Sequence, residues 1–363
     1  MQLFGVPGAI GVPGRVPVPT DAVRALPAVL APLAGGTFLH VDLAPGPIAV
    51  LVVALALYLW GVARNNRLHP RHPWPAKRTA AFVGGIAVVA VALVSFLGVY
   101  DTTLFWDHMV QHLMLIMVAA SLFAASSPVD LAWRASIGGA HRRFTRWLRS
   151  RPSRLLGHPA TAFVLYGVLV PLTHLTVFFD YAIELRAVDD LEHFLFVAIG
   201  YLFWRNIFGH DPNRYRLHPA VRALLLFFAV PVDTFVGLSL DNESHEIFPA
   251  FAAEHRTWGP SLVADLHLGG VIMWVGGDML MTLGLIPVIV QWVRMDERRA
   301  TRVDRVLDAY FPVPGTLGPS GGAAGVGERA GQPTAGYALG RHTPRRSTAR
   351  GPARARAEPG DPA

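Results

Sequence analysis

Two histidines stand four residues apart at the start of an apolar segment, "DHMVQHLMLIM". In a helix His108 and His112 would share one face, because residues four apart are surface neighbours. Such a pair can give two imidazole nitrogens to one metal ion, or one nitrogen to each of two ions. A single histidine inside a membrane more often hydrogen-bonds to a neighbouring helix. The pair therefore favours a metal site only if other ligands join it.

The other candidate ligands are three histidines that also fall in apolar segments. The chain contains no cysteine, which excludes thiolate zinc sites and iron–sulfur clusters within it. A metal ion would have to use histidine, methionine or carboxylate ligands. We predict a metal site formed by the five histidines of the apolar segments: His108, His112, His174, His193 and His267.

Methionines accompany these histidines and allow two interpretations. Met109 and Met273 lie in the same apolar segments as His108 and His267, and we take them as possible soft ligands. Thioethers suit Cu(I). They suit an adaptable packing interface equally well.

Polar residues in the same segments are expected to support the site from a second layer: Gln111, Glu192, Asp233, Trp274 and Asp278. Glu192 directly precedes His193 and points in another direction on a helix, so we expect it to accept a hydrogen bond from a neighbouring imidazole. Asp278 lies deep in its apolar segment, and Asp233 lies in the half of another that we expect to face outward. A carboxylate there either pairs with a partner or carries protons or ions.

The elements that position these residues are expected to be membrane-spanning helices. Hydrophobic residues make up 52% of the 363-residue chain and charged residues only 16%, whereas soluble domains carry roughly a quarter charged residues. A span needs about 20 mainly apolar residues. The sequence predicts seven such spans: Pro47–Ala63, Thr79–Tyr100, His108–Ser126, Ala160–Phe179, Leu191–Phe208, Pro219–Leu240 and Leu262–Trp292.

The connecting loops alternate between basic and acidic composition. Arginines concentrate in the first, third and fifth connections and after the last span, whereas the second, fourth and sixth connections are mainly acidic. By the positive-inside rule this pattern predicts an all-α membrane bundle with its N-terminus outside and its C-terminus in the cytoplasm. All five histidines then lie in the outer half of the membrane.

The ends of the chain differ from this region. We predict a weakly structured extension at residues 1–45, a membrane domain at 46–305 and a disordered basic tail at 306–363, rich in Gly, Pro, Ala and Arg. The net charge of +7 reflects loop and tail arginines. We therefore expect membrane lipid, and no nucleic acid, as a partner.

Three classes of chemistry fit these residues: handling of metal by the histidines, haem ligation by histidines of facing helices, and transport coupled to Asp233 and Asp278. Hydrolysis fits less well. The spacing of His108 and His112 lacks the glutamate of a metalloprotease HExxH motif, and Gln111 cannot act as a general base. No feature requires turnover of a substrate, so we do not expect an enzyme.

A series of motifs over residues 40–303 resembles a known family. Their order and spacing are similar to those of the multi-span CtaG-type cytochrome c oxidase assembly factors of caa-type oxidases. The motifs are "HVDLAPGPIAVLVVALALYLWGVAR" at the first span, then "HMVQHLMLIM", "SSPVDLAWRA", "PLTHLTVFFDYA", "LEHFLFVAIGYLFWRNIFG" and "GVIMWVGGDML".

The resemblance implies a multi-pass protein of the bacterial cell membrane that acts in respiratory-chain assembly. Its implied role is maturation of cytochrome c oxidase, around copper insertion, with oxidase subunits and a soluble outer copper chaperone as partners. Copper is the expected metal, and haem is not favoured. A haem-binding redox or sensor protein and a carboxylate-coupled transporter remain the alternatives. The polar positions carried over from the family are His108, Gln111, His112, His174, Glu192, His193, His267 and Asp278.

Overall fold

The computed structural model describes residues 45–208, 211–212, 215–245, 247–253 and 258–310. The chain forms two compact units, Met1–Arg305 and Val306–Ala363, and of the second only the first five residues fall in the described ranges. Every regular element in these ranges is a helix and none is a strand, so the all-helical prediction is confirmed. The predicted N-terminal extension and nearly all of the predicted tail lie outside the described residues.

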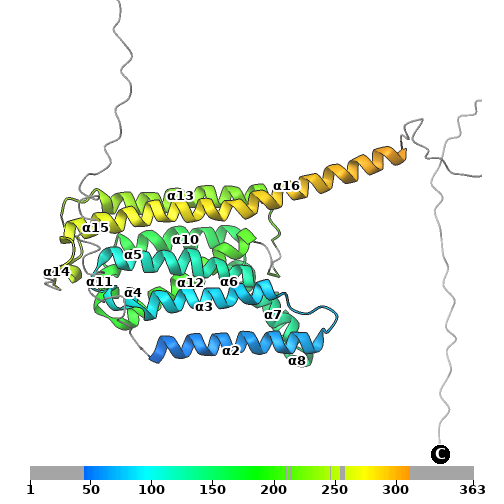
Figure 1. Cartoon of the computed structure of the whole chain (residues 1–363), viewed down its shortest axis with the longest axis horizontal. Coiled ribbons are helices and arrows are strands. Elements are labelled where there is room, and N and C mark those ends of the chain that lie inside the picture. Colours follow the sequence, from blue (N-terminus) through cyan, green and yellow to red (C-terminus); the bar gives the residue numbers. More distant parts are fainter. Residues whose placement is uncertain (1–44, 209–210, 213–214, 246, 254–257, 311–363) are drawn as a thin grey trace, which may run out of the picture. The chain divides into compact units, whose positions relative to one another are not determined.

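Helices of very different lengths follow one another along the chain (Figure 1). The longer ones are α2 (Pro45–Leu68), α3 (Ala76–Val94), α10 (Pro159–His174), α12 (Arg186–Phe208) and α13 (Pro219–Asp241). Two composite helices contain a π-helical segment: α5 (Phe105–Leu113), η3 (Met114–Ala119) and α6 (Ala120–Ser126); then α15 (Leu262–Val271), η4 (Ile272–Gly276) and α16 (Gly277–Tyr310). The shorter helices are α4 (Phe96–Tyr100), α7 (Pro128–Ala135), α8 (Gly138–Leu148), α9 (Arg151–Leu156), α11 (Phe178–Glu184) and α14 (Pro249–Ala253).

Five stretches of the described chain are long and apolar enough to cross a membrane: Pro45–Leu68, Ala76–Tyr100, Phe105–Ala135, Pro219–Asp241 and Leu262–Leu307. The bent pair α10 and α11 makes a sixth if it counts as one span. Helix α12 has 23 residues but is not among them; Glu192, His193 and Arg205 interrupt its apolar run. Membrane-length helices are therefore confirmed, and the seven-span count and orientation stay predictions.

The fourth predicted span, Ala160–Phe179, does not form one straight helix. Helix α10 ends at His174, and α11 begins at Phe178 with a bend of 68°. Pro171 lies in the last turn of α10, where its missing N–H removes a helical hydrogen bond. The Thr176 hydroxyl accepts a hydrogen bond from the N–H of Phe178, the first residue of α11. The bend places His174 at the end of its helix.

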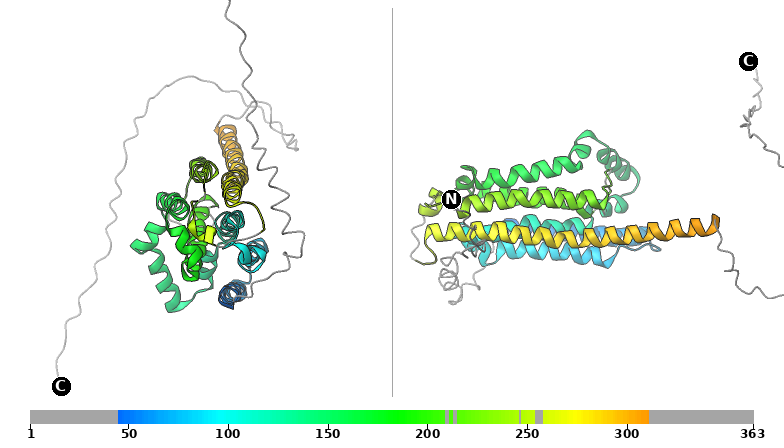
Figure 2. Two further views of the ribbon diagram at one scale, coloured as in Figure 1. Left: turned by 90° about the vertical axis from the view of Figure 1, so that its left-hand side faces the viewer. Right: turned by 90° about the horizontal axis from the view of Figure 1, so that it is seen from above.

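The composite helix that carries His108 and His112 lies at the centre of the bundle. In its most apolar window 61% of the residues are buried, compared with 11% for α2. It packs against α3, α12 and α15, whereas α2 packs mainly against α3 and α7. Figure 2 shows these helices nearly end-on and from above. Groups on its inward-facing turns are therefore shielded on several sides.

Close contact between α12 and η3 depends on one glycine. A Cβ atom at Gly200 would lie 2.6 Å from the Ile116 carbonyl oxygen, a distance that side chains do not tolerate. The same oxygen accepts a hydrogen bond of 3.0 Å from the Trp204 indole N–H. π-Helical turns leave carbonyl groups without their regular partners and are frequent near functional sites. The contact sets how closely Glu192, on the same helix as Gly200, approaches the histidine helix.

Candidate metal centre

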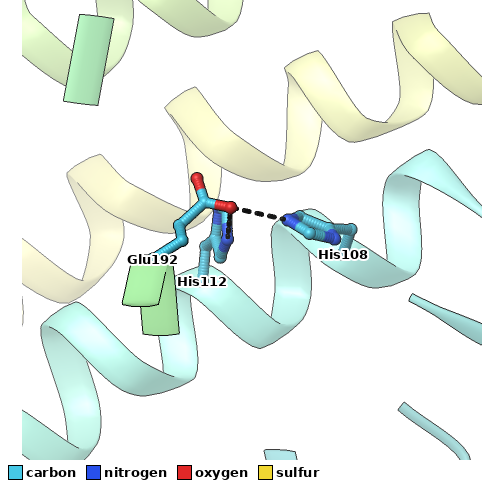
Figure 3. Close-up of side chains that lie close together, drawn as sticks. All are labelled: His108, His112 and Glu192. Atoms are coloured by element: carbon cyan, nitrogen blue, oxygen red, sulfur yellow. Dashed lines mark ion pairs between the residues drawn. The ribbon is translucent and has the colours of Figure 1, made fainter. Parts of the chain in front are cut away.

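Three buried side chains from two helices converge at one point. Helix α5 supplies His108 and His112, and α12 supplies Glu192 (Figure 3). The Glu192 Oε2 atom lies 3.9 Å from Nε2 of His108 and 3.8 Å from Nε2 of His112. His108 and Glu192 are fully buried, and His112 is only 3% exposed. This triad brings together the histidine pair that the sequence singled out and the glutamate expected to support it.

A backbone carbonyl fixes the tautomer of His108. Its Nδ1 lies 3.2 Å from the carbonyl oxygen of Asp101. A carbonyl oxygen can only accept a hydrogen bond, so Nδ1 must carry the proton. In a neutral ring Nε2 then carries a lone pair, and this is the atom that faces Glu192. Histidines that bind metals are commonly held in this way through their second nitrogen.

A two-step relay fixes the tautomer of His112. The Nδ1 of His174 lies 2.8 Å from the Val170 carbonyl oxygen and therefore donates to it. The His174 Nε2 atom is left with a lone pair and lies 3.1 Å from Nδ1 of His112. His112 must then donate from Nδ1, which leaves its own Nε2 as a lone pair directed at Glu192. Thr173 also contacts His174 Nδ1, at 2.9 Å, from the same helix end.

Four polar atoms of the triad have no hydrogen-bond partner. This holds for Nε2 of both α5 histidines and for both carboxylate oxygens of Glu192. Two lone pairs and a carboxylate cannot satisfy one another without a proton or a cation between them, and unpaired buried polar groups are costly. The chemistry of this donor set, two imidazole nitrogens and one carboxylate oxygen, fits a metal ion.

The spacing of the triad also suits a metal ion. Bonds of about 2.0–2.2 Å place two ligands of a tetrahedral or trigonal ion ~3.3–3.8 Å apart. The observed separations of 3.8 and 3.9 Å would have to shorten by roughly half an ångström or less. All three ligand atoms lie within 4.8 Å of one another.

Aromatic rings pack against both histidines of the triad. The ring of Phe196 stacks on His112 with centroids 4.1 Å apart, and Phe179 meets His108 edge-on at 5.1 Å. Both phenylalanines are buried. An ion bound here would lie in a medium of low dielectric, where a single carboxylate charge counts for more than it does in water.

A second group of polar residues lies beside the triad. His193, on α12, is close to Asp189 on the same helix and to Asp101, which precedes α5. Gln111 joins the two groups, because its Oε1 accepts from His193 Nε2 at 2.9 Å and its Nε2 donates to Asp101 Oδ2 at 3.2 Å. The structure therefore places His193 and Gln111 next to the triad but in a separate cluster.

The predicted residues of the last helix face α13 instead of the triad. His267 Nε2 contacts the backbone carbonyl of Glu243, just beyond α13, at 2.6 Å. Trp274, on η4, lies against Gly237 of α13, where the two helices approach closely. Asp278 accepts hydrogen bonds of 3.2 and 3.1 Å from Thr234. His267, Trp274 and Asp278 are not brought into contact with the histidine cluster.

The predicted soft ligands lie beside His112 and His174. Met109, Met273 and Asp233 line a cavity of about 10 Å³ together with His112 and His174, a volume that accommodates roughly one water molecule. Asp233 accepts hydrogen bonds of 2.9 and 2.7 Å from the Tyr166 hydroxyl. Asp233 therefore has a structural partner, and the thioethers adjoin the relay histidines and are not part of the triad.

The acidic residues of this region that were not among our predicted site residues include Asp101, Asp189 and Asp265. Asp265, on α15, accepts the backbone N–H groups of Phe105 and Trp106 at 3.1 and 3.0 Å and so caps the helix that carries the histidines. Negative charge at a helix N-terminus is stabilising. The only available sequence signal was the acidic character of this end of the bundle, because the contacts join residues about 160 positions apart.

Comparison with known proteins places the chain in a family. It matches the family model of the cytochrome c oxidase caa3 assembly factor over residues 56–295. Uncharacterized proteins of Mycobacterium bovis and Mycobacterium tuberculosis are each 32% identical to it over 246 residues, which is 66% of this chain and 37% of theirs. An uncharacterized protein of Mycobacterium leprae is 30% identical over 262 residues, or 70% of this chain and 40% of its own length.

The matched region spans about two fifths of the length of these curated relatives. No solved structure matches the chain. The family match covers more than half of the chain and includes every residue of the triad, so this protein belongs to the cytochrome c oxidase caa3 assembly factor family.

Proposed function

We propose that this protein binds one copper ion between His108, His112 and Glu192 and supplies it to cytochrome c oxidase during assembly. The observation that carries the proposal is the set of hydrogen bonds to Nδ1 of His108 and of His112. These bonds fix both tautomers so that two buried Nε2 lone pairs face a carboxylate without a hydrogen-bond partner. The family role in oxidase assembly supplies the recipient.

The donor set supports copper as the cargo. Nitrogen and oxygen ligands bind divalent first-row metals in an order that peaks at Cu²⁺. Three ligands leave the ion without a full coordination shell, which suits an ion that must be handed on. The absence of cysteine keeps the site free of the thiolates that would hold copper more firmly.

The proposed topology has seven spans, with the N-terminus outside, the C-terminus in the cytoplasm and the copper site in the outer half of the bacterial cell membrane. Helix α12 would be the seventh span although it is less apolar than the others, since its polar residues Glu192, His193 and Asn206 are buried within the bundle. Acidic residues mark the end of the bundle nearest the triad, and arginines mark the connections at the opposite end, in agreement with the positive-inside rule.

This topology is open to a labelling test because the chain has no cysteine of its own. The single variant Glu184→Cys should react with a membrane-impermeant thiol reagent in intact cells. The single variant Arg143→Cys should react only after the membrane is permeabilised. The reverse pattern would contradict the proposed orientation.

The copper role can be tested in a bacterium that lacks its own copy of the assembly factor. The wild-type chain should restore oxidase activity and oxidase-bound copper, whereas the double variant His108→Ala/His112→Ala should restore neither. The matched control is His69→Ala/His72→Ala, which removes two exposed imidazoles elsewhere in the chain. Each variant must be present in membranes at the wild-type level. Normal oxidase copper in the His108/His112 variant would overturn the proposal.

A further inference from the structure

The second polar cluster, Asp101, Asp189 and His193, has the geometry of a cation site of its own. One ligand atom from each residue lies within 4.8 Å of the other two. His193 Nε2 and Asp189 Oδ1 are 3.4 Å apart, and that oxygen is buried without a hydrogen bond. Asp101 and His193 are 7% and 5% exposed. Two carboxylates and an imidazole form a donor set typical of a divalent metal ion.

These three residues, called the outer cluster below, line a large polar cavity. The cavity has a volume of about 530 Å³ and lies between the start of α12, α11 and the α4–α5 connection. Three further charged residues line it, Glu184, Arg186 and Asp190, and all three are exposed. The cavity therefore gives solvent-borne ions a polar route to the outer cluster, whereas aromatic rings close the triad.

The outer cluster and the triad share a framework. Gln111 lies between the two triad histidines in sequence and hydrogen-bonds to both Asp101 and His193. The backbone carbonyl of Asp101 holds the ring of His108. The ring centroid of His193 is 6.2 Å from that of His108 and 6.0 Å from that of His112. An ion that leaves one site is thus within a few ångströms of the other.

We infer that Asp101, Asp189 and His193 form a second, weaker cation site that takes divalent copper from the outer cavity and passes it inward to His108, His112 and Glu192. The inference rests on the proposed copper role of the triad. An ion at the outer site binds Nε2 of the His193 tautomer that carries its proton on Nδ1, in place of the hydrogen bond to Gln111, and keeps part of its water shell. At the triad it gains a second imidazole in place of one carboxylate. Nitrogen ligands bind Cu²⁺ more strongly, so the step inward is downhill.

The test uses the purified full-length protein and Cu²⁺ alone. Equilibrium dialysis with metal analysis gives the number of ions bound, and a time course of uptake gives the rate at which the tight site fills. Asp189→Asn removes an outer ligand while keeping the shape of the side chain. Asp190→Asn is the matched control, because Asp190 lines the same cavity but is not one of the three clustered residues.

Wild-type protein and Asp190→Asn should bind two ions, one weakly and one tightly. Asp189→Asn should lose the weak ion and fill the tight site about tenfold more slowly or worse. Binding and uptake equal to wild type in Asp189→Asn would overturn the outer site. If that variant is not monodisperse, Asp101→Asn takes its place, with the same expected loss and the same contradicting result.

The two proposals fail in different ways. If His108→Ala/His112→Ala loses the tight ion while Asp189→Asn behaves as wild type, the triad stands and the outer site is overturned. If Asp189→Asn loses copper while the double histidine variant keeps all of it, the outer cluster binds and the proposed triad function fails. A wild-type chain that binds no Cu²⁺ contradicts both.

Discussion

The variant Glu192→Gln distinguishes two roles for this carboxylate. If Glu192 is a metal ligand, the metal-free variant should be more stable than wild type. If Glu192 stabilises the fold, the variant should be less stable. Both Glu192 oxygens are buried without a donor, beside two imidazole lone pairs. A glutamine amide has two N–H donors and can offer one to each ring. Each hydrogen bond contributes a net ~0.5–1.5 kcal/mol. We therefore expect the metal-free Glu192→Gln protein to be about 1–3 kcal/mol more stable than wild type.

Copper binding should change in the other direction. The Glu192→Gln variant lacks the negative charge that lies 3.8 and 3.9 Å from the two ring nitrogens. Loss of a supporting group around a metal costs about 10–100-fold in affinity, or ~1.4–2.7 kcal/mol, and loss of a ligand should cost at least as much. The assays are thermal unfolding with a chelator present and Cu²⁺ dialysis. Glu184→Gln, at an exposed residue of α11, is the control that should change neither quantity.

A result of lower stability with unchanged copper affinity would refute this reasoning. It would mean that Glu192 stabilises the fold through contacts with its neighbours and does not bind the ion. Lower stability together with weaker copper binding would show a disrupted helix packing, which a circular dichroism spectrum of the same sample would detect.

The remaining predictions concern the groups that hold the triad in place. His174→Leu should weaken copper binding about 10–100-fold, because the His112 ring loses the acceptor that keeps the proton on its Nδ1. His174→Gln keeps an acceptor and should lose less affinity. Equilibrium dialysis with Cu²⁺ compares the two variants. Gly200→Ala should destabilise the protein by about 1–3 kcal/mol in thermal unfolding, because its Cβ would clash with a carbonyl 2.6 Å away. Gly167→Ala, with its nearest contact at 3.9 Å, should be nearly neutral. Asp265→Ala should cost ~1–3 kcal/mol, because two backbone N–H groups lose their acceptor, whereas Asp296→Ala at an exposed position should not.

The sequence predicted the central pair of the site because helix periodicity is local. His108 and His112 had to share a face once their segment was helical, and the structure places both Nε2 atoms toward one carboxylate. Glu192 was expected to assist an imidazole. Its direct position between two lone pairs depends on how closely α12 approaches η3, and this follows from packing at Gly200 that no local pattern reveals.

Other parts of the site depended on contacts between distant segments. The sequence grouped His174 and His267 with the pair because all lie toward one end of their segments. The structure places His174 behind His112 as a hydrogen-bond acceptor and His267 at the Glu243 carbonyl. Which nitrogen of a ring is protonated is set by such tertiary partners. The bend after His174 had a local signal in Pro171, but the apolar run around it favoured one continuous span.

The central claim is that the triad binds copper, and metal analysis of the purified protein tests it most directly. The full-length chain is loaded with Cu²⁺, passed through gel filtration to remove weakly bound ions, and analysed by mass spectrometry beside His108→Ala/His112→Ala. We predict about one copper per wild-type chain and almost none in the variant. Equal copper in both proteins, or none in the wild type, would contradict a copper site between His108, His112 and Glu192.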